Sequence, residues 1–177
     1  EKLERDRKRG IKNRPIRAMI AGIPNVGKST FINSLVGKAC TKTGNKPGVT
    51  KGKQWIKLNK NIELLDTPGI LWPKFESDEV GQNLAITGAI RDEILPIEDI
   101  SCILISKMIK YGLWNILKER YKLLDEDKSE IMGEILEKIA LRNKMFNKGE
   151  SLNIQQAAYT VLRDYRNCRL SKFGLDK

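Results

Sequence analysis

The sequence GIPNVGKS at residues 22–29 decides how the first part of this chain folds. It matches the pattern G-x-x-x-x-G-K-[ST], in which glycines let a loop wrap phosphates with inward-pointing backbone N–H groups. An apolar run at residues 16–21 predicts a buried strand before the loop, and residues 28–36 predict a helix that ends at Gly37. This strand–loop–helix context predicts a phosphate-binding loop, because the helix N-terminus adds a positive dipole. A ligand-free glycine-rich turn is the less favoured alternative.

Two side chains of the loop are candidates for direct contact with phosphate and metal. We expect the Lys28 ammonium to reach the β- and γ-phosphates and the Ser29 hydroxyl to ligate Mg²⁺. The residues of this region predicted to contact the nucleotide are Pro24, Asn25, Val26, Gly27, Lys28, Ser29 and Thr30.

A second phosphate-site element, DTPG, lies at residues 66–69, where a predicted strand at residues 62–65 ends. We expect Asp66 to hold Mg²⁺ through water and the Gly69 amide to face the γ-phosphate. The same four residues also fit a simple turn, so the motif is weak by itself. Its position after a predicted strand, downstream of the loop, makes the phosphate-site interpretation the stronger one.

A switch threonine is expected in the loop at residues 38–53, which is rich in Gly, Thr, Lys and Pro. Thr50 is the candidate, since its hydroxyl would complete the Mg²⁺ shell only when a γ-phosphate is present. A plain surface threonine is the alternative for Thr50, and Thr41 and Thr43 are less favoured candidates for the switch role.

The order of predicted elements is strand, loop, helix, strand, strand and then several helices. The second strand is predicted at residues 54–58. From about residue 78, apolar residues recur with helical spacing, as at Ile131, Ile135 and Ile139, and Asp127 and Asn153 are predicted N-caps. The predicted fold class is α/β, as part of a P-loop GTPase (Rossmann-like, doubly wound) domain followed by an α-helical C-terminal domain.

Composition favours a polyanionic partner. The net charge is +11, and residues 18–62 contain eight lysines and no acid. Three scattered cysteines and no histidine argue against a zinc site and suit reduced thiols in the cytoplasm. No apolar run approaches the ~20 residues that a membrane span needs.

The guanine-reading motif Asn-Lys-x-Asp is missing after residues 66–69, and two Asn-Lys pairs, at residues 45–46 and 147–148, fail at the fourth position. The segments GIPNVGKST (residues 22–30), KTGNKPGVT (42–50) and LDTPGILWP (65–73) closely resemble the circularly permuted ribosome biogenesis GTPase A (YlqF) family. Residues 75–96, with LAITGAI, and the segment LRDYR at 162–166 also resemble that family.

The resemblance implies that the base-reading motifs lie upstream of the phosphate loop. This chain would then be the C-terminal part of a longer protein that also contains the upstream half. The implied domains are a basic linker at residues 1–14, the phosphate-binding half of the GTPase domain at 15–95 and an RNA- and ribosome-contacting helical domain at 96–177. The implied function is that of a cytoplasmic switch that binds and hydrolyses GTP in late assembly of the large ribosomal subunit, with its rRNA and guanine nucleotide (GTP/GDP) as partners.

The implied reaction is in-line attack of water on the γ-phosphate, and we expect Lys28, Thr50 and Gly69 to take part. Ile70 stands where many GTPases have a water-orienting glutamine, and the resemblance places a catalytic histidine in the upstream part, so hydrolysis by this chain should be very slow. Asn25 resembles the asparagine of GTPases that bind K⁺ beside the phosphates; a loop asparagine in an unusual backbone conformation is the alternative.

The last helix has a row of cations, Arg163, Arg166, Arg169 and Lys172, that could contact RNA phosphates or form a solvated face. A second reading of the whole chain is an RNA-binding fragment with a vestigial nucleotide site, favoured by Ile70 and the missing guanine motif. A P-loop ATPase is a third reading, but it explains Thr50 and residues 66–69 poorly.

Overall fold

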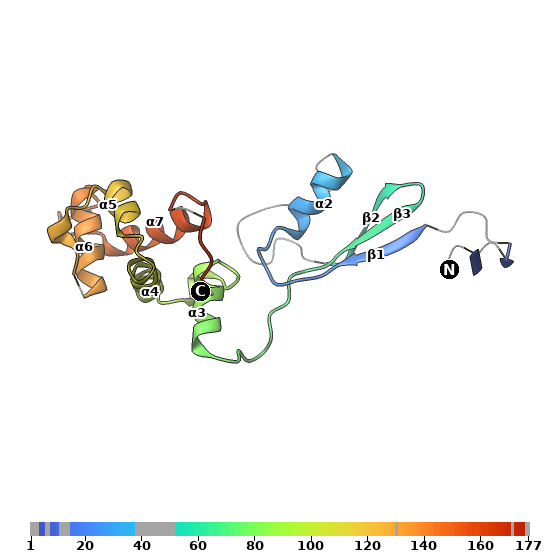
Figure 1. The fold of residues 1–177 in the computed structure, drawn as a ribbon, viewed down its shortest axis with the longest axis horizontal. Helices are drawn as coiled ribbons and strands as arrows, with labels where there is room; N and C mark the ends of the chain where they lie inside the picture. Colours follow the sequence, from blue (N-terminus) through green and yellow to red (C-terminus); the bar gives the residue numbers. More distant parts are fainter. Residues whose placement is uncertain are drawn as a thin grey trace. The chain divides into compact units, whose positions relative to one another are not determined.

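A computed structural model describes residues 4–5, 8–10, 15–37, 52–129, 131–170 and 172–175 (Figure 1). Contacts divide the chain into two compact units, Glu1–Pro73 and Lys74–Lys177, which we call the sheet unit and the helical unit. None of the helices in these described residues is long and apolar enough to cross a membrane.

The sheet unit contains the three predicted strands and the predicted helix. Its elements are β1 (Ile16–Ile20), α2 (Lys28–Val36), β2 (Gln54–Asn59) and β3 (Ile62–Asp66). The strand order is β1-β3-β2, with β1 parallel and β2 antiparallel to β3. Because β1 and β3 are parallel and Ile20 is the Cα partner of Asp66, the loops that follow both strands begin at the same edge of the sheet.

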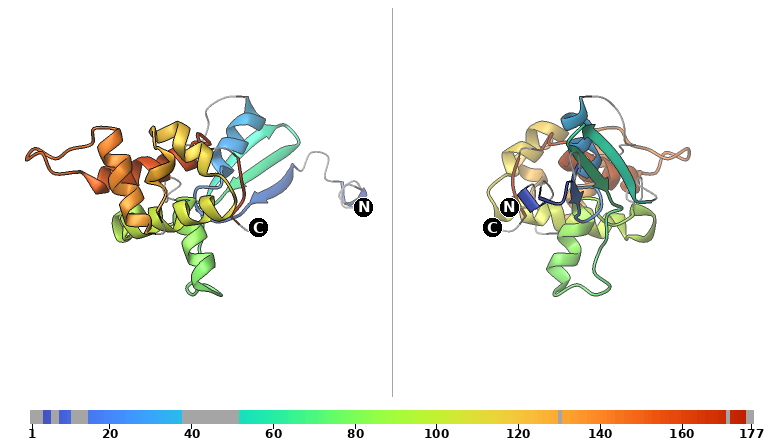
Figure 2. Two further views of the ribbon diagram at one scale, coloured as in Figure 1. Left: turned by 60° about the vertical axis from the view of Figure 1, so that its left-hand side comes forward. Right: turned by 90° about the vertical axis from the view of Figure 1, so that its right-hand side faces the viewer.

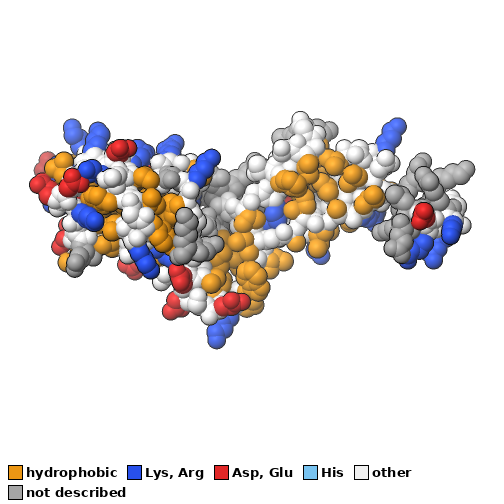
Figure 3. All heavy atoms as spheres, in the orientation of Figure 1, with side chains coloured by type: hydrophobic (Ala, Val, Ile, Leu, Met, Phe, Trp, Pro, Cys, Tyr) orange, Lys and Arg blue, Asp and Glu red, His pale blue; other side chains and the backbone are white. Residues whose placement is uncertain are grey.

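Among the described residues of the sheet unit, few hydrophobic side chains are buried. Ile32 of α2 is fully buried, and the cross-strand partners Ile56 and Leu64 are nearly so. β1 was predicted to be buried, but its residues are exposed or half-buried, with Met19 65% exposed. The physical reason is that β1 is an outer strand of the sheet and nothing in the described residues covers it. Figure 3 shows hydrophobic side chains on the surface of this unit.

The helical unit has one continuous apolar core. Its longest helices are α4 (Ile97–Lys110), α6 (Met132–Arg142) and α7 (Ile154–Arg166), and all three contact one another. The shorter elements are α3 (Asp78–Ile86), η1 (Asp92–Ile94), α5 (Trp114–Tyr121) and η2 (Asp125–Asp127). The predicted core positions Ile135 and Ile139 are fully buried, whereas Ile131 precedes α6 and is exposed. Figure 2 shows the loop between α6 and α7, in orange, extending beyond the helices, where Phe146 and Leu152 form an isolated bridge.

Arg166 ties α7 to the first part of the helical unit. Its guanidinium donates to both carboxylate oxygens of Asp92 at 2.8 and 2.9 Å, and to the carbonyls of Ala85 and Ile86 at 2.9 Å each. The segment from α3 to η1 therefore packs with the helices, and the boundary between the two compact units falls after Pro73.

Candidate functional site

The loops that follow β1 and β3 are joined by two hydrogen bonds. The Thr67 hydroxyl donates to the carbonyl of Ile20 at 2.8 Å. The backbone N–H of Ile70 donates to the carbonyl of Gly22 at 3.3 Å. These bonds bring the two predicted phosphate-site elements, residues 22–29 and 66–69, into one site.

Gly69 and Pro24 form the closest contact between the two loops. A Cβ atom built on Gly69 would lie 2.4 Å from the Pro24 Cα and 2.5 Å from the Pro24 nitrogen. No side chain fits at such distances from backbone atoms, so glycine is required there for steric reasons. Two residues predicted as nucleotide contacts therefore touch each other.

The phosphate loop leads into the N-terminus of α2. Gly27 is the N-cap with φ 87°, and Asn25 has φ 60°, both in the left-handed region. Among the described residues, no side chain caps the helix and no acid occupies its first turn. The helix thus has no acidic residue of its own at the positive end of its dipole, which can attract an anion. The backbone of Asn25 gives direct support to its alternative role as a loop residue in an unusual conformation.

Lys28 folds back over the loop from the first turn of α2. Its ammonium donates to the carbonyls of Ile23 at 2.7 Å and Gly22 at 3.1 Å. Burial lowers the pKa of Lys28, and the negative charge of Asp66 opposes this shift. The contacts hold the cation at the mouth of the loop, next to the carboxylate at the end of β3.

Ser29 and Asp66 meet beside Lys28. The Ser29 hydroxyl donates to Asp66 Oδ2 at 3.2 Å. Asp66 is only 1% exposed, and its Oδ1 atom is buried without a hydrogen-bond partner among the described residues. A buried polar atom without a partner costs about 1–3 kcal/mol, so this oxygen favours a cation or a water molecule next to it.

The donor set of this pair fits Mg²⁺. A hydroxyl and a carboxylate are the oxygen ligands that this hard cation takes, and Mg²⁺ usually binds only one or two protein groups together with substrate phosphates and waters. The described part of the chain has no group of three or more His, Cys, Asp or Glu arranged to hold a metal.

The remaining predicted site residues lie at the rim of this site or outside the description. Val26 is 55% exposed and Thr30 is exposed on α2. Thr50 lies outside the described residues, as do Thr41 and Thr43.

Sequence reasoning missed Thr67, whose hydroxyl anchors the DTPG loop to β1. It also missed the carbonyls that Lys28 contacts. The polar residue between Asp66 and Pro68 was the available signal for Thr67. The sequence had no signal for the carbonyls.

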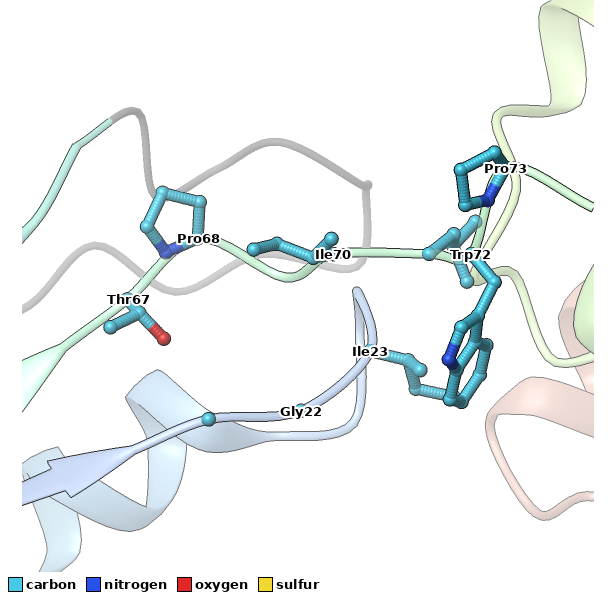
Figure 4. A pocket seen from close by; sticks show the side chains of 9 residues that line it. Gly22, Ile23, Thr67, Pro68, Ile70, Trp72 and Pro73 are labelled. Carbon is cyan, nitrogen blue, oxygen red and sulfur yellow. The ribbon is translucent and has the colours of Figure 1, made fainter.

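A pocket of about 360 Å³ adjoins the site on the side of the DTPG loop (Figure 4). Figure 4 shows the Trp72 ring lying beside Ile23 at one end of it. Ile70, in place of a water-orienting glutamine, is 76% exposed. The lining residues are Ala21, Gly22, Ile23, Thr67, Pro68, Ile70, Leu71, Trp72 and Pro73.

Known proteins resemble this chain in sequence and in fold. Residues 17–148 match the family model described as 50S ribosome-binding GTPase. A ribosome biogenesis GTPase A of Priestia megaterium is 45% identical over 177 residues, covering 99% of this chain and 60% of the relative. A GDP-bound structure of YlqF matches with a TM-score of 0.63 at 23% identity, and the GNP-bound YlqF of T. maritima with 0.55 at 25% identity. Each structural match covers 99% of this chain and 66% of the other.

These matches confirm the predicted resemblance and the predicted fold class, an α/β part of a P-loop GTPase followed by helices. The chain spans about 60% of the length of the curated relative.

Proposed function

This chain belongs to the 50S ribosome-binding GTPase family, and from that premise we propose that it is the phosphate- and Mg²⁺-handling part of a GTP-binding and hydrolysing switch in late assembly of the large ribosomal subunit. The relative from Priestia megaterium is named for ribosome biogenesis, and the two related solved structures hold GDP and GNP. Guanine nucleotide is therefore the proposed ligand, although the described residues include no guanine-reading motif.

The observation that carries this proposal is the contact between Ser29 and Asp66. The two side chains approach within 3.2 Å at the mouth of the phosphate loop, and one buried carboxylate oxygen keeps unused acceptor capacity. We propose that Ser29 ligates Mg²⁺ directly and that Asp66 holds it through water, with Thr50 as a third ligand in the GTP state. When bound, Mg²⁺ neutralises phosphate charge.

Lys28 and the start of α2 are the proposed phosphate ligands. The ammonium now bonds to the carbonyls of Gly22 and Ile23 and is close enough to the loop interior to contact β- and γ-phosphates. The uncapped N-terminus of α2 adds backbone N–H groups and a positive dipole. Pro24, Val26, Gly27 and Thr30 complete the proposed contacts in this region.

Hydrolysis is proposed to be in-line attack of water, with Lys28, Thr50 and Gly69 stabilising the γ-phosphate. Ile70 has no group that can orient the water, so we expect this chain alone to hydrolyse GTP very slowly. A K⁺ ion beside Asn25 is part of the proposal as a source of positive charge.

The upstream half of a circularly permuted GTPase domain is a proposed partner of this chain. β1 is an outer strand with exposed residues, and an unpaired strand edge is a template for a further strand. Since the chain spans about 60% of its relative, we propose that the rest of the GTPase domain pairs with β1 and supplies the guanine-reading motif.

Large-subunit rRNA is the proposed partner of the helical unit, and the cytoplasm the proposed location. The support is the family match; the net charge of +11 lies in residues 1–73, because residues 74–177 hold 17 Lys+Arg and 17 Asp+Glu.

Binding of labelled GDP and GTP by this chain, with and without Mg²⁺, tests the proposed function. We expect Mg²⁺ to strengthen binding and Ser29→Ala to abolish the Mg²⁺ effect. Excess GTP should displace the label better than excess ATP only when the proposed upstream half, which would read guanine, is also present. Equal displacement by ATP in a protein that includes the upstream half would contradict guanine specificity and favour an ATPase. Folded chain with no nucleotide binding would favour the alternative of an RNA-binding fragment with a vestigial site. Nucleotide-dependent association with isolated large ribosomal subunits tests the partner.

A further inference from the structure

The segment that follows the DTPG loop runs along the phosphate loop and is joined to it at two successive residues. The Ile70 N–H donates to the carbonyl of Gly22 at 3.3 Å. Two residues further on, the Trp72 ring lies beside the Ile23 side chain (Figure 4), and both residues line the same pocket. All of these residues belong to the sheet unit. The segment at residues 70–72 therefore lies against two neighbouring residues of the phosphate loop.

Gly22 and Ile23 are also the two residues that hold the ammonium of Lys28. This ammonium donates to the Ile23 carbonyl at 2.7 Å and to the Gly22 carbonyl at 3.1 Å. A lysine side chain is a flexible four-carbon stem, so its ammonium keeps one position only if its acceptors keep theirs. The place of the cation that is proposed to meet the β- and γ-phosphates thus depends on two residues that the segment at 70–72 contacts.

The backbone leaves Trp72 little conformational freedom. Trp72 precedes Pro73, and a residue before a proline is restricted to extended conformations because the proline ring clashes with helical ones. Thr67, near the start of the same segment, also precedes a proline, and its hydroxyl donates to the Ile20 carbonyl at 2.8 Å. The chain from Thr67 to Trp72 is therefore anchored to the phosphate-loop side by a side chain at each end.

Stabilisation of the core does not account for the position of Trp72. The residue is 65% exposed, and the buried hydrophobic side chains described in the sheet unit, Ile32, Ile56 and Leu64, are not among those that line its pocket. Replacement of a mostly exposed side chain usually changes the free energy of unfolding little. The neighbour that the ring does have is Ile23, whose carbonyl holds Lys28.

We propose that Trp72 is a positioning residue of the nucleotide site: its ring packs on Ile23 and keeps the carbonyls of the phosphate loop where they hold the Lys28 ammonium. The inference rests on the proposed function and deepens it, since it adds a residue outside the two phosphate-site motifs. Trp72 acts through Ile23 and Lys28 and is not itself a phosphate ligand. Because the same segment continues from Gly69, the proposed γ-phosphate contact, loss of the ring should affect GTP more than GDP.

Competition of GTP and of GDP against labelled GDP, with Mg²⁺ and the whole chain, tests the proposal. Trp72→Ala should lower the affinity for GTP about tenfold and that for GDP about threefold, because a weakened charge-assisted hydrogen bond to phosphate costs roughly this much. Trp72→Phe keeps an aromatic ring beside Ile23 and should restore most of the loss.

Trp55→Ala is the matched control. Trp55 is also an exposed tryptophan of the sheet unit, at 50%, but it lies on β2 and does not line the pocket. Its replacement should leave the affinities for both nucleotides unchanged. A loss of the same size in Trp55→Ala and Trp72→Ala would overturn the proposal, because it would show a general effect of removing an exposed indole.

A double-variant cycle tests the route through Ile23. If Trp72 acts by packing on Ile23, the variant with both Ile23→Ala and Trp72→Ala should lose no more GTP affinity than the weaker-binding single variant, since the effects of contacting residues are not additive. Additive losses would overturn the proposal. A ratio of GTP to GDP affinity in Trp72→Ala equal to that of wild type would also overturn it, and a lowered melting temperature with that equal ratio would show a structural role only.

The wild-type chain separates this proposal from the proposed function. If wild type binds labelled GDP with Mg²⁺ and Trp72→Ala binds both nucleotides equally well, the nucleotide switch stands and only the role of Trp72 is wrong. If the folded wild-type chain binds no nucleotide, the proposed function fails and the role of Trp72 fails with it.

Discussion

Gly69 lies against Pro24 so closely that a Cβ at Gly69 would be 2.4 Å from the Pro24 Cα. The contact joins the loop after β3 to the loop after β1, and both loops contain proposed phosphate ligands. A methyl group at this position must push the loops apart, because both contacted atoms belong to the backbone and cannot rotate away.

Gly69→Ala should therefore weaken nucleotide binding, and GTP more than GDP, because the Gly69 amide is the proposed γ-phosphate contact. We expect a loss of about tenfold for GTP, measured by competition against labelled GDP. Gly133→Ala is the matched control. No atom lies within 4 Å of a Cβ built there, and alanine within α6 should stabilise the chain by about 0.5–1 kcal/mol. Unchanged GTP affinity in Gly69→Ala would show that the loops can separate without effect on the site.

Asp66→Asn should separate metal binding from folding. The substitution removes a buried charge whose Oδ1 has no partner among the described residues, so the chain without ligand should be as stable as wild type or slightly more so. Wild type should melt at a higher temperature when Mg²⁺ and GDP are added together, because ligands of the folded state stabilise it. The variant should lose most of this rise. An equal rise in both proteins would rule out Asp66 as part of the metal site.

Arg166→Gln should destabilise the helical unit. The change removes two bonds to Asp92 and two to backbone carbonyls, all at 2.8–2.9 Å and partly buried, at a cost of about 2–3 kcal/mol. Arg163→Gln, on the same helix but exposed, should change the free energy of unfolding by less than about 0.5 kcal/mol. Urea titration monitored by circular dichroism measures both, and equal effects would contradict the structural role of Arg166.

Asp127 should make the helical unit sensitive to acid. Burial raises the pKa of Asp127, but hydrogen bonds from Arg142 and the Leu124 N–H, with the charge of Arg142, outweigh burial and lower the pKa overall. A lowered pKa in the folded state means that Asp127 contributes stability above its ordinary pKa of about 4. That contribution is lost as the pH falls through the lower folded value.

Asp127→Asn should accordingly cost about 1–3 kcal/mol at neutral pH, and the difference from wild type should shrink as the pH falls below about 4. Denaturant titrations at several pH values measure this. Asp125→Asn is the control: Lys118 lowers the pKa of Asp125, but the carboxylate is exposed and solvent screens the pair. A difference that does not depend on pH would refute the role of the Asp127 charge.

Local signals in the sequence were enough to predict the elements around the site. The strand before residues 22–29, the helix after them, its end at Gly37 and the N-cap Asn153 all depend on neighbours along the chain. The prediction of Asp127 as a helix N-cap was wrong, because the N-cap of α6 is Ile131. The Asp127 carboxylate instead accepts a hydrogen bond from the Leu124 N–H in the short turn η2. A residue type that is favoured at N-caps does not, from the sequence alone, show which of the nearby turns it caps.

Other features depend on partners far along the chain, and the sequence could not predict them. Arg166 pairs with Asp92, which is 74 residues away in the sequence. No local signal could therefore show that Arg166 does not belong to the row of solvent-facing cations. Phe31 and Leu35 of α2 have helical spacing for a core face, but they are 56% and 48% exposed. Periodicity predicts which face is apolar, while burial also requires something that packs against it.

Thr67 offers a test of how the two loops are kept together. Its hydroxyl is the donor to the Ile20 carbonyl, and the residue is 8% exposed. Thr67→Val keeps the shape but removes the donor, which should cost about 1–3 kcal/mol of stability, whereas Thr67→Ser keeps the donor and should cost less. Because Thr67 immediately precedes Pro68 and Gly69, loss of the bond should also let the DTPG loop move relative to β1. We therefore expect Thr67→Val to lower the ratio of GTP to GDP affinity several-fold, and Thr67→Ser to restore it. A loss of stability with an unchanged affinity ratio would mean that Thr67 supports the fold and has no part in positioning Gly69.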